Sequence, residues 1–504
     1  MIRNTIAKEF LMCGICGTKF LRYCTAGNIT STKRFSQWVT CSEKQNTTHL
    51  PDQDFSKWIK QLVKPSLSQI SKRGYSQKAS RSDKSKMRKE LNELDNMPKA
   101  ERVYVWGCAA TGALGISSYV RHQEKKQKYL AQMSRPARLR FLLEHNLVAK
   151  SVDCGYGFTA LILKGRDRKS KLYGCGINTD SQLGFHKSSE KPDMVLDYIT
   201  EPVLIPLPLE DPDSSEVIDV SCGRAHTVVL TTEGVFSLGH NAYGQCGRGI
   251  VEGEIHRGSQ IINKVLDLPN DVIKVVCGQD HTFYLTSGGQ VYSCGLGADG
   301  QTGLQHYHCE WKPSLVRGDI EGEKIIQISS KGDCVLAVSE RGDLFGWGNS
   351  EYGQLSAITD QTQVSVPRNL PLPHSISKAA AAGSKCAVLT DKNDVLVWGF
   401  GALGVGPNVT TSSTPQTIPP TLFGRNEMAP DKLVKDITCG INHFAARTND
   451  FEMYVWGKNQ KGCLGIYVAQ QLDQSYPFRV SVPAEVMRIS CGVDHTVAMC
   501  RAFS

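Results

Sequence analysis

The chain has 504 residues, of which 40% are hydrophobic and 21% are charged, a composition typical of folded globular proteins. It contains no apolar run of about 18 residues, so no membrane-spanning helix is predicted. The net charge of +9 comes from residues 1–100, which hold 19 Lys/Arg against 8 Asp/Glu. Residues 101–504 hold 39 Lys/Arg against 41 Asp/Glu. Because this larger part of the chain is slightly acidic, we expect no general affinity for DNA.

Residues 1–40 have the composition of an organelle transit peptide. They are rich in Arg, Lys, Ser and Thr, and their one acidic residue is Glu9. We expect mitochondrial import, into the matrix or to the inner membrane, with a disordered tail as the alternative. Cys13 and Cys16 have no second pair at a zinc-ligand spacing, so no metal is predicted there.

Residues 41–100 are polar and predict a linker or arm. The segment 71–90 carries eight basic and two acidic residues. A solvated linker is one interpretation. A basic arm that lies along RNA or anionic lipid is the other, and it would allow peripheral association with the inner membrane.

From residue 101 to 504 the chain repeats two elements in alternation. The first is an apolar run that ends in Trp-Gly or a substitute, followed in most copies by a glycine turn and Leu-Gly. Its copies are VYVWGCAATGALG (103–115), LYGCGINTDSQLG (172–184), VFSLGHNAYGQCG (235–247), VYSCGLGADGQTG (291–303), LFGWGNSEYGQLS (344–356), VLVWGFGALG (395–404) and MYVWGKNQKGCLG (453–465).

The second element is an apolar run around Cys-Gly-x-x-His. Its copies are VDCGYGFTALIL (152–163), VSCGRAHTVVL (220–230), VVCGQDHTFYL (275–285), ISSKGDCVLAV (328–338), AAAGSKCAVL (380–389), ITCGINHFAA (437–446) and ISCGVDHTVAM (489–499). The runs are short, rich in Val, Ile, Tyr and Trp, and bounded by glycine, which predicts strands joined as hairpins. Their glycines predict bulges or close backbone approach.

Seven such units predict an all-β, seven-bladed β-propeller, because a small sheet buries both faces only by stacking on copies of itself. The first strand lacks an upstream partner and the last lacks a downstream one. We therefore predict that strand 103–106 pairs with strand 495–500 and closes the ring. The first two units have the longest connections, which favours that side as the functional edge.

The Cys-Gly-x-x-His motif predicts a scaffold feature, because it recurs once per blade and its copies cannot converge on one metal. We predict no metal, no cofactor and no catalytic residue. The sequence places these residues at the histidine position: Phe158, His226, His281, Cys334, Cys386, His443 and His495. Where histidine is present, we expect it to donate a structural hydrogen bond. The cysteines, spread through apolar runs, predict buried free thiols.

The alternation of Trp-Gly…Gly-x-Leu-Gly with Cys-Gly-x-x-His resembles the regulator of chromosome condensation repeat family over about 400 residues. With a transit peptide, the chain is similar to the mitochondrial branch of that family. The resemblance implies a binding protein and not an enzyme. It implies guanine-nucleotide exchange on a mitochondrial dynamin-like fusion GTPase, or a role with a module that pseudouridylates large-subunit mitochondrial ribosomal RNA.

Exchange-competent relatives turn acidic and histidine side chains of these loops toward the GTPase, and the resemblance implies the same for the matching residues of this chain. The matching residues are Asp280, His281, Asp494, His495, His226, His443 and Asp333. Such relatives also carry a wedge inserted after one Trp-Gly strand. No such insertion occurs here, which argues against the nuclear type of exchange.

A basic segment interrupts the first unit at 121–140. Its seven basic residues are Arg121, Lys125, Lys126, Lys128, Arg135, Arg138 and Arg140. An exposed basic loop is one interpretation, and contact with RNA phosphate or an acidic partner is the other. The sequence holds no Walker, His-Glu-x-x-His or Gly-x-Ser-x-Gly motif, so none of the enzyme classes those motifs mark is indicated.

Overall fold

The computed structural model describes residues 102–120, 131–167, 169–189, 193–467 and 473–503. The predicted transit peptide (1–40), the predicted arm (41–100) and four of the predicted basic residues (Arg121, Lys125, Lys126 and Lys128) lie outside the described residues. Within the described part, no helix has both the length and the apolar character needed to cross a membrane.

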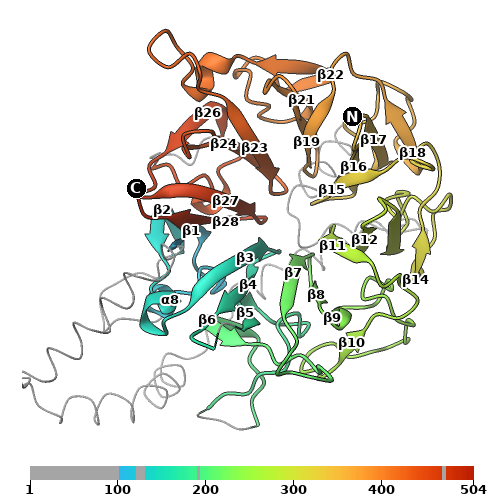
Figure 1. Ribbon diagram of the computed structural model, residues 1–504, viewed down its shortest axis with the longest axis vertical. Helices are drawn as coiled ribbons and strands as arrows, with labels where there is room; N and C mark the ends of the chain where they lie inside the picture. The colour runs from blue at the N-terminus through green and yellow to red at the C-terminus, as the bar shows by residue number, and fades with distance from the viewer. Residues whose placement is uncertain (1–101, 121–130, 168, 190–192, 468–472, 504) are drawn as a thin grey trace, which may run out of the picture. The chain divides into compact units, whose positions relative to one another are not determined.

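The described residues form seven four-stranded antiparallel sheets, set radially as blades around a common axis (Figure 1). The predicted seven-bladed propeller is therefore confirmed. Blade 1 contains β27 (Glu485–Cys491), β28 (His495–Arg501), β1 (Arg102–Cys108) and β2 (Gln132–Arg138).

Blades 2 to 7 each use four consecutive strands, numbered from the axis outward. Blade 2 has β3 (Val148–Cys154), β4 (Phe158–Lys164), β5 (Ser170–Ile177) and β6 (Tyr198–Leu204). Blade 3 has β7 (Val217–Cys222), β8 (His226–Thr231), β9 (Gly234–Gly239) and β10 (Ile262–Lys264). Blade 4 has β11 (Val272–Cys277), β12 (His281–Thr286), β13 (Val291–Gly295) and β14 (Glu310–Leu315). Blade 5 has β15 (Ile325–Ser329), β16 (Cys334–Ser339), β17 (Leu344–Asn349) and β18 (Gln363–Leu370). Blade 6 has β19 (Ile376–Ala381), β20 (Lys385–Thr390), β21 (Val395–Phe400) and β22 (Thr411–Ile418). Blade 7 has β23 (Val434–Cys439), β24 (His443–Thr448), β25 (Met453–Gly457) and β26 (Gln474–Val480). The helical pieces that the structure describes are short: α7 (Ser117–Val120), α8 (Phe141–Glu144), η1 (Pro420–Phe423) and η2 (Gln460–Gly462).

The ring closes where the first described strand meets the last. β1 pairs antiparallel with β28 in an unbroken register from Arg102 opposite Cys500 to Gly107 opposite His495. Figure 1 shows the blue-green start of the propeller beside its red end. The predicted pairing of 103–106 with 495–500 is confirmed.

The middle strands of each blade carry the core. β8, β12, β16 and β20 are buried along their whole length, since each packs between two neighbouring blades. Three Trp-Gly tryptophans, Trp106, Trp347 and Trp398, hydrogen-bond to the adjacent blade, and Trp106 Nε1 donates at 2.8 Å to the Cys463 carbonyl of blade 7. Trp106 thus buries its apolar ring in the core while the adjacent blade satisfies its one N–H donor.

The Trp-Gly glycines mark bulges where the third strand passes very close to the second. The register between β1 and β2 shifts between Val105 and Gly107, and Gly107 has φ +115°. A Cβ on Gly107 would lie 2.4 Å from the Asp494 carbonyl oxygen and 2.4 Å from the His495 Cα. The predicted bulge and the predicted close approach are both present, and only glycine fits there.

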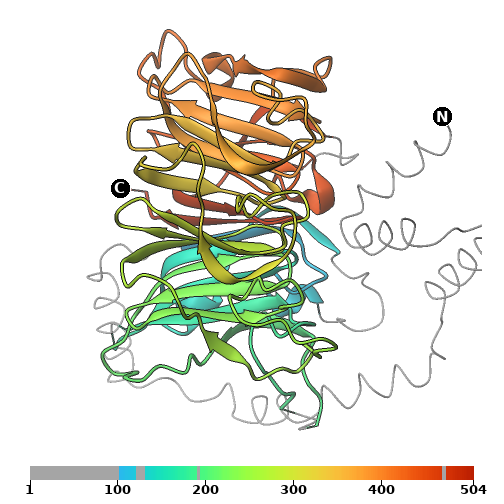
Figure 2. The same cartoon turned by 90° about the vertical axis from the view of Figure 1, so that its right-hand side faces the viewer.

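The turns between the first and second strands all lie at one face of the ring, because the seven blades share one strand order and direction. Figure 2 shows the ring edge-on. We call this face the Cys-Gly face and define it by residues 155–157, 223–225, 278–280, 330–333, 382–384, 440–442 and 492–494. The connections from third to fourth strands reach the same face because the strands alternate in direction. Blade 3 also has a long connection there, 240–261, in addition to the first two units.

Candidate functional site

The four motif histidines lie inside the ring and not on its surface. His226, His281, His443 and His495 are each 0% exposed. His226 Nε2 lies 3.1 Å from Thr282 Oγ1 in the next blade, and that hydroxyl donates at 2.7 Å to the Gln245 carbonyl. Because the hydroxyl proton is used in this way, the imidazole N–H must be the donor to Thr282 Oγ1. The histidine is thus part of the joint between two blades.

The other histidines make the same kind of contact. His281 Nε2 lies 3.1 Å from Ser330 Oγ, and His443 Nε2 lies 2.9 Å from Thr496 Oγ1. Burial lowers the pKa of His226, His281 and His443 to about 3, so these rings are neutral near pH 7. The predicted scaffold role is confirmed. A direct contact of these imidazoles with a partner would require the turns above them to move.

The glycine of the motif makes room for the histidine ring. A Cβ on Gly278 would lie 2.1 Å from His281 Cε1, and one on Gly223 would lie 2.2 Å from His226 Cε1. The imidazole folds back over the glycine and fills the space that a side chain would need. This contact explains why Cys-Gly and His occur together in the sequence.

One assignment made from the sequence is wrong. In blade 6 the structure places Lys385 at the histidine position, opposite Gly399, and Cys386 opposite Trp398. The short segment SKCAVL offered a cysteine at the expected spacing, but the strand pairing begins one residue earlier. Cys386 instead packs toward Cys334, with 3.9 Å between their sulfur atoms.

Asp280 forms an ion pair between blades 3 and 4 on the Cys-Gly face. Arg224 Nη2 lies 2.6 Å from Asp280 Oδ2, and its Nε donates to Oδ1 at 3.1 Å. The Asp280 side chain is 1% exposed, whereas that of Arg224 is 24% exposed. Burial raises the pKa of Asp280 to about 6, although the guanidinium opposes the shift. At this joint it is Arg224 that is open to the surface.

Asp333 lies at the next joint, between blades 4 and 5, with its side chain 24% exposed. Its Oδ1 accepts a 3.2 Å hydrogen bond from Gln301 Nε2 and lies 3.9 Å from His281 Nδ1. Burial, together with the negative charges of Asp299 and Asp280, raises the pKa of Asp333 to about 7. This side of the face therefore holds a carboxyl group that a basic partner could ionise.

Asp494 lies above the closing blade, beside His495. Its Oδ1 is 3.4 Å from His495 Nδ1, and its side chain is 17% exposed. Burial acts to lower the pKa of His495, but Cys154 and Asp494 raise it above its usual value, unlike the other three motif histidines. Cys154 and His495 are 1% and 0% exposed, so this Cys-His-Asp combination offers no access to a substrate.

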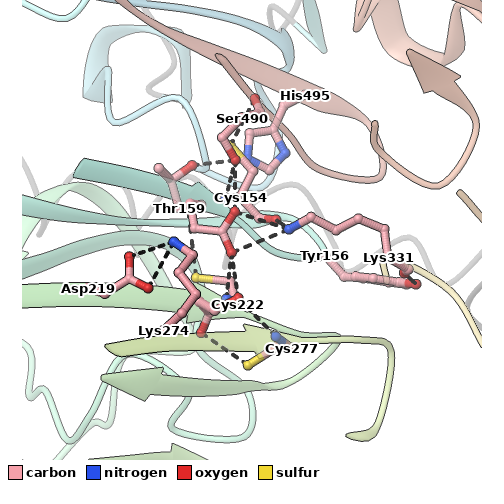
Figure 3. A network of polar contacts seen from close by, with 12 residues as sticks. Cys154, Tyr156, Thr159, Asp219, Cys222, Lys274, Cys277, Lys331, Ser490 and His495 are labelled. Carbon is pink, nitrogen blue, oxygen red and sulfur yellow. Dashed lines mark hydrogen bonds and ion pairs between the residues drawn. The ribbon is translucent and has the colours of Figure 1, made fainter. Parts of the chain in front are cut away.

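On this face a lysine side chain of blade 5 reaches across the axis of the ring to blade 2 (Figure 3). Lys331 of blade 5 lies 3.1 Å from Asp153 Oδ1 of blade 2 and donates to the Cys154 carbonyl at 3.1 Å. Tyr156 reaches back from blade 2, and its hydroxyl donates to the Lys331 carbonyl at 3.0 Å. We call Asp153, Tyr156 and Lys331 the cross-axis contact.

Asp153 also joins the blades on either side of its own. It accepts hydrogen bonds from Ser490 Oγ of blade 1 at 2.9 Å and from the Cys222 backbone N–H of blade 3 at 2.7 Å. Burial would raise the pKa of Asp153, but Lys331 and these donors hold it below its usual value. Burial acts to lower the pKa of Lys331, but the charge of Asp153 keeps that pKa above its usual value. The pair is therefore charged over a wide pH range.

The predicted basic loop is partly a strand. Arg135 and Arg138 lie in β2, the outer strand of blade 1, because the chain there pairs with β1. Both are exposed, as is Arg140 just beyond the strand. The Arg135 guanidinium lies 5.1 Å from the centre of the Tyr467 ring. The described half of the segment is thus a basic rim and not a loop.

Sequence reasoning missed Asp153, Tyr156, Lys331 and Arg224 as site residues. Asp153 is a charged residue where the other copies have an uncharged one, and Lys331 stands at the glycine position of the motif. That departure from the repeat was the available signal for these two residues. Tyr156 and Arg224 occupy the variable position after Cys-Gly and gave no such signal. In the described part of the chain, no group of three or more His, Cys, Asp or Glu side chains is arranged to hold a metal ion. The described cysteines are all free, and all except Cys309 are buried, as predicted.

Comparisons with known proteins agree on one family. The RCC1-like domain model matches residues 97–401, and the regulator of chromosome condensation (RCC1) repeat matches residues 452–499. A human protein described as RCC1-like G exchanging factor-like protein is 48% identical over 412 residues, covering 80% of this chain and 88% of its own. The mouse protein of the same description is 47% identical.

Solved structures give the same result. The crystal structure of human WBSCR16 is similar with a TM-score of 0.74 and 47% identity, covering 81% of this chain and all of that one. Prp20p from Saccharomyces cerevisiae has a TM-score of 0.64 at 19% identity, which shows a common fold. With its repeats, its closed ring and these matches, the chain belongs to the RCC1 family and is an RCC1-like, exchange-factor-like β-propeller.

Proposed function

We propose that this chain is a non-catalytic regulator, in mitochondria, of a dynamin-like GTPase that fuses the inner membrane. The observation that carries the proposal is the pair of partly exposed carboxyl groups at the Cys-Gly face, Asp333 and Asp494, beside the buried motif histidines. Support comes from the relatives described as RCC1-like G exchanging factor-like proteins. Association at the inner membrane and import through residues 1–40 are part of the same proposal.

The geometry limits how such a regulator works. The motif imidazoles are buried, so the groups available to a partner are the edges of the turns, among them Asp333, Asp494 and Arg224. A partner that brings a Lys or Arg side chain to Asp333 would favour its ionised form and release a proton. Binding should therefore weaken as the pH falls through 7, because protonation removes the negative charge.

The test is nucleotide release from the purified fusion GTPase. We expect the full chain to accelerate release, and Asp333→Asn to reduce the effect. Asp213→Asn is the matched control, because that side chain is 98% exposed and lies outside the Cys-Gly face. No acceleration at a saturating concentration of the propeller would end the exchange proposal.

A second candidate function is a scaffold for pseudouridylation of large-subunit mitochondrial ribosomal RNA. The exposed arginines of the basic rim favour it, since Arg135 beside Tyr467 offers a charge for phosphate and an aromatic face for a base. Crosslinking in mitochondria should recover large-subunit RNA. Neutralising Arg135, Arg138 and Arg140 should reduce the recovery, whereas neutralising Arg317, an exposed arginine of blade 4, should not. Equal recovery from both variants would count against this role.

A further inference from the structure

The joint between blades 6 and 7 lacks the histidine–hydroxyl hydrogen bond that links blades at four other joints. There, Lys385 stands where blades 3, 4, 7 and 1 have histidine. The residue facing it from the next blade is Phe444, in the position where other blades present the Thr282 or Thr496 hydroxyl. A phenyl ring offers no acceptor of that kind, so the amine must find another partner.

Lys385 finds one acceptor among the described residues. Its Nζ donates to the Ala402 carbonyl at 3.3 Å and lies 5.9 Å from the centre of the Phe444 ring. The residue is 3% exposed. A protonated amine has three N–H donors, so this environment satisfies the ammonium poorly. The shortened segment 399–404 explains the contact, because it brings the Ala402 carbonyl to the lysine.

The same contact leaves a second donor without a partner. In blades 1, 5 and 6 the Trp-Gly indole donates to a backbone carbonyl of the preceding blade, as Trp347 does to Gln301 at 3.0 Å. The equivalent carbonyl for Trp456 is that of Ala402, which Lys385 uses. Trp456 Nε1 is buried and has no hydrogen-bond partner in the described residues.

Both side chains lie against the Phe444 ring. The Trp456 ring stacks on Phe444 with 5.4 Å between centroids and an interplanar angle of 20°. Its Nε1 lies close to Gly404, where an added Cβ would come within 2.9 Å. A buried amine and a buried N–H donor thus share a neighbour, and an anionic group on the amine would give the indole its acceptor.

We propose that Lys385 is a carbon dioxide site, at which its amine forms a carbamate whose oxygens accept a hydrogen bond from Trp456 Nε1. The neutral amine attacks the carbon of CO₂, one C=O π bond opens as the N–C bond forms, and the nitrogen loses one proton to solvent. No oxidant, reductant or other co-reactant takes part. A bulky acyl donor does not fit a side chain that is 3% exposed, whereas CO₂ is small, linear and uncharged.

The electrostatic surroundings support the neutral amine that this step needs. Burial lowers the pKa of Lys385 to about 8, so a fraction of the amine is unprotonated near neutral pH. The charged and titratable groups that act on it all come from blade 7 and are Asp473, Cys463, Lys458, Cys439 and His443. Of these, Lys458 favours the neutral amine and also attracts the carbamate, and Asp473 opposes both.

The test is chemical trapping on the purified full chain. The protein is equilibrated with ¹³C-bicarbonate near pH 8, treated with a trialkyloxonium salt that esterifies carbamates, and digested for mass spectrometry. We expect a ¹³C-carbamate ester on Lys385 that increases from pH 7 to pH 9. Lys385→Arg should abolish it, and Trp456→Phe should lower it about tenfold through the loss of one hydrogen bond to a charged group.

Two controls make the result decisive. Trp347→Phe removes an indole donor at another joint and should leave the adduct on Lys385 unchanged. The exposed Lys264 should carry no adduct under the same conditions. Absence of an ester on wild-type Lys385 would overturn the proposal, and an equal yield in Trp456→Phe would overturn the role of the indole.

Discussion

Removing the charge of Lys331 should destabilise the whole ring. The variant Lys331→Met keeps the length of the side chain but leaves Asp153 without its counter-charge. Loss of one partner of a buried ion pair typically costs about 3–5 kcal/mol. Here the two side chains keep 18% and 16% exposure, and Asp153 retains its hydrogen-bond donors, so we expect a loss of about 2–3 kcal/mol.

The assay is urea unfolding of the purified chain, with Lys324→Met as the control. Lys324 is in the same blade and pairs with Glu340 at 2.6 Å, but these side chains are 50% and 60% exposed. Its removal should cost less than about 1 kcal/mol. If Lys331→Met also costs less than about 0.5 kcal/mol, or if its effect simply adds to that of Asp153→Asn in a double-mutant cycle, the cross-axis contact does not hold the ring together.

The pH dependence gives a second check on the same pair. The pKa of Asp153 is lowered in the folded state, so its stabilisation is present above the unfolded value of about 3.9 and is lost as the pH falls through the folded value. In Lys331→Met the lowering by the lysine charge is gone and burial dominates. The folded pKa of Asp153 then rises, and acid unfolding should begin at a higher pH than in the wild type.

Three further predictions concern the ring itself. Gly107→Ala should lower the free energy of unfolding in urea by about 2–4 kcal/mol, because the added Cβ would meet backbone atoms of the neighbouring strand. Gly249 has open space around it, so Gly249→Ala should change the free energy of unfolding by less than about 1 kcal/mol. Thr496→Val should cost about 1–3 kcal/mol by leaving the buried His443 N–H without an acceptor, and an unchanged unfolding midpoint would contradict the assigned tautomer. Deleting residues 495–501 should make the edge of β1 sensitive to limited proteolysis, and full resistance would refute the closure as described.

The fold could be predicted because its information is repeated. Seven copies of two short patterns indicated the blades, and the unpaired first and last strands indicated the closing pair, confirmed by the register from Arg102 to Gly107. The glycine bulges followed from the Trp-Gly pattern in the same way. Local spacing within a strand is visible in a sequence whenever many copies of it agree.

The site was harder to predict because its contacts are made between blades. Lys331 and Asp153 are far apart in the sequence and meet only because blades 5 and 2 face each other across the axis. The assignment of Cys386 failed for a related reason, since the strand pairing and not the spacing of similar residues decides which side chain faces Gly399. A contact of this kind is made once in the ring, so the repeat pattern of the sequence does not predict it.

The closing blade has a consequence for the order of assembly. β1 is synthesised before every other strand of the propeller, and its neighbour β28 is synthesised last. Blades 2 to 7 can each form as soon as their own four consecutive strands are available. Blade 1 must wait for the entire chain, so its formation is a late folding event with a large loop-closure cost. Until then β1 has an open edge, and any factor that protects the newly made protein would act most usefully on that strand.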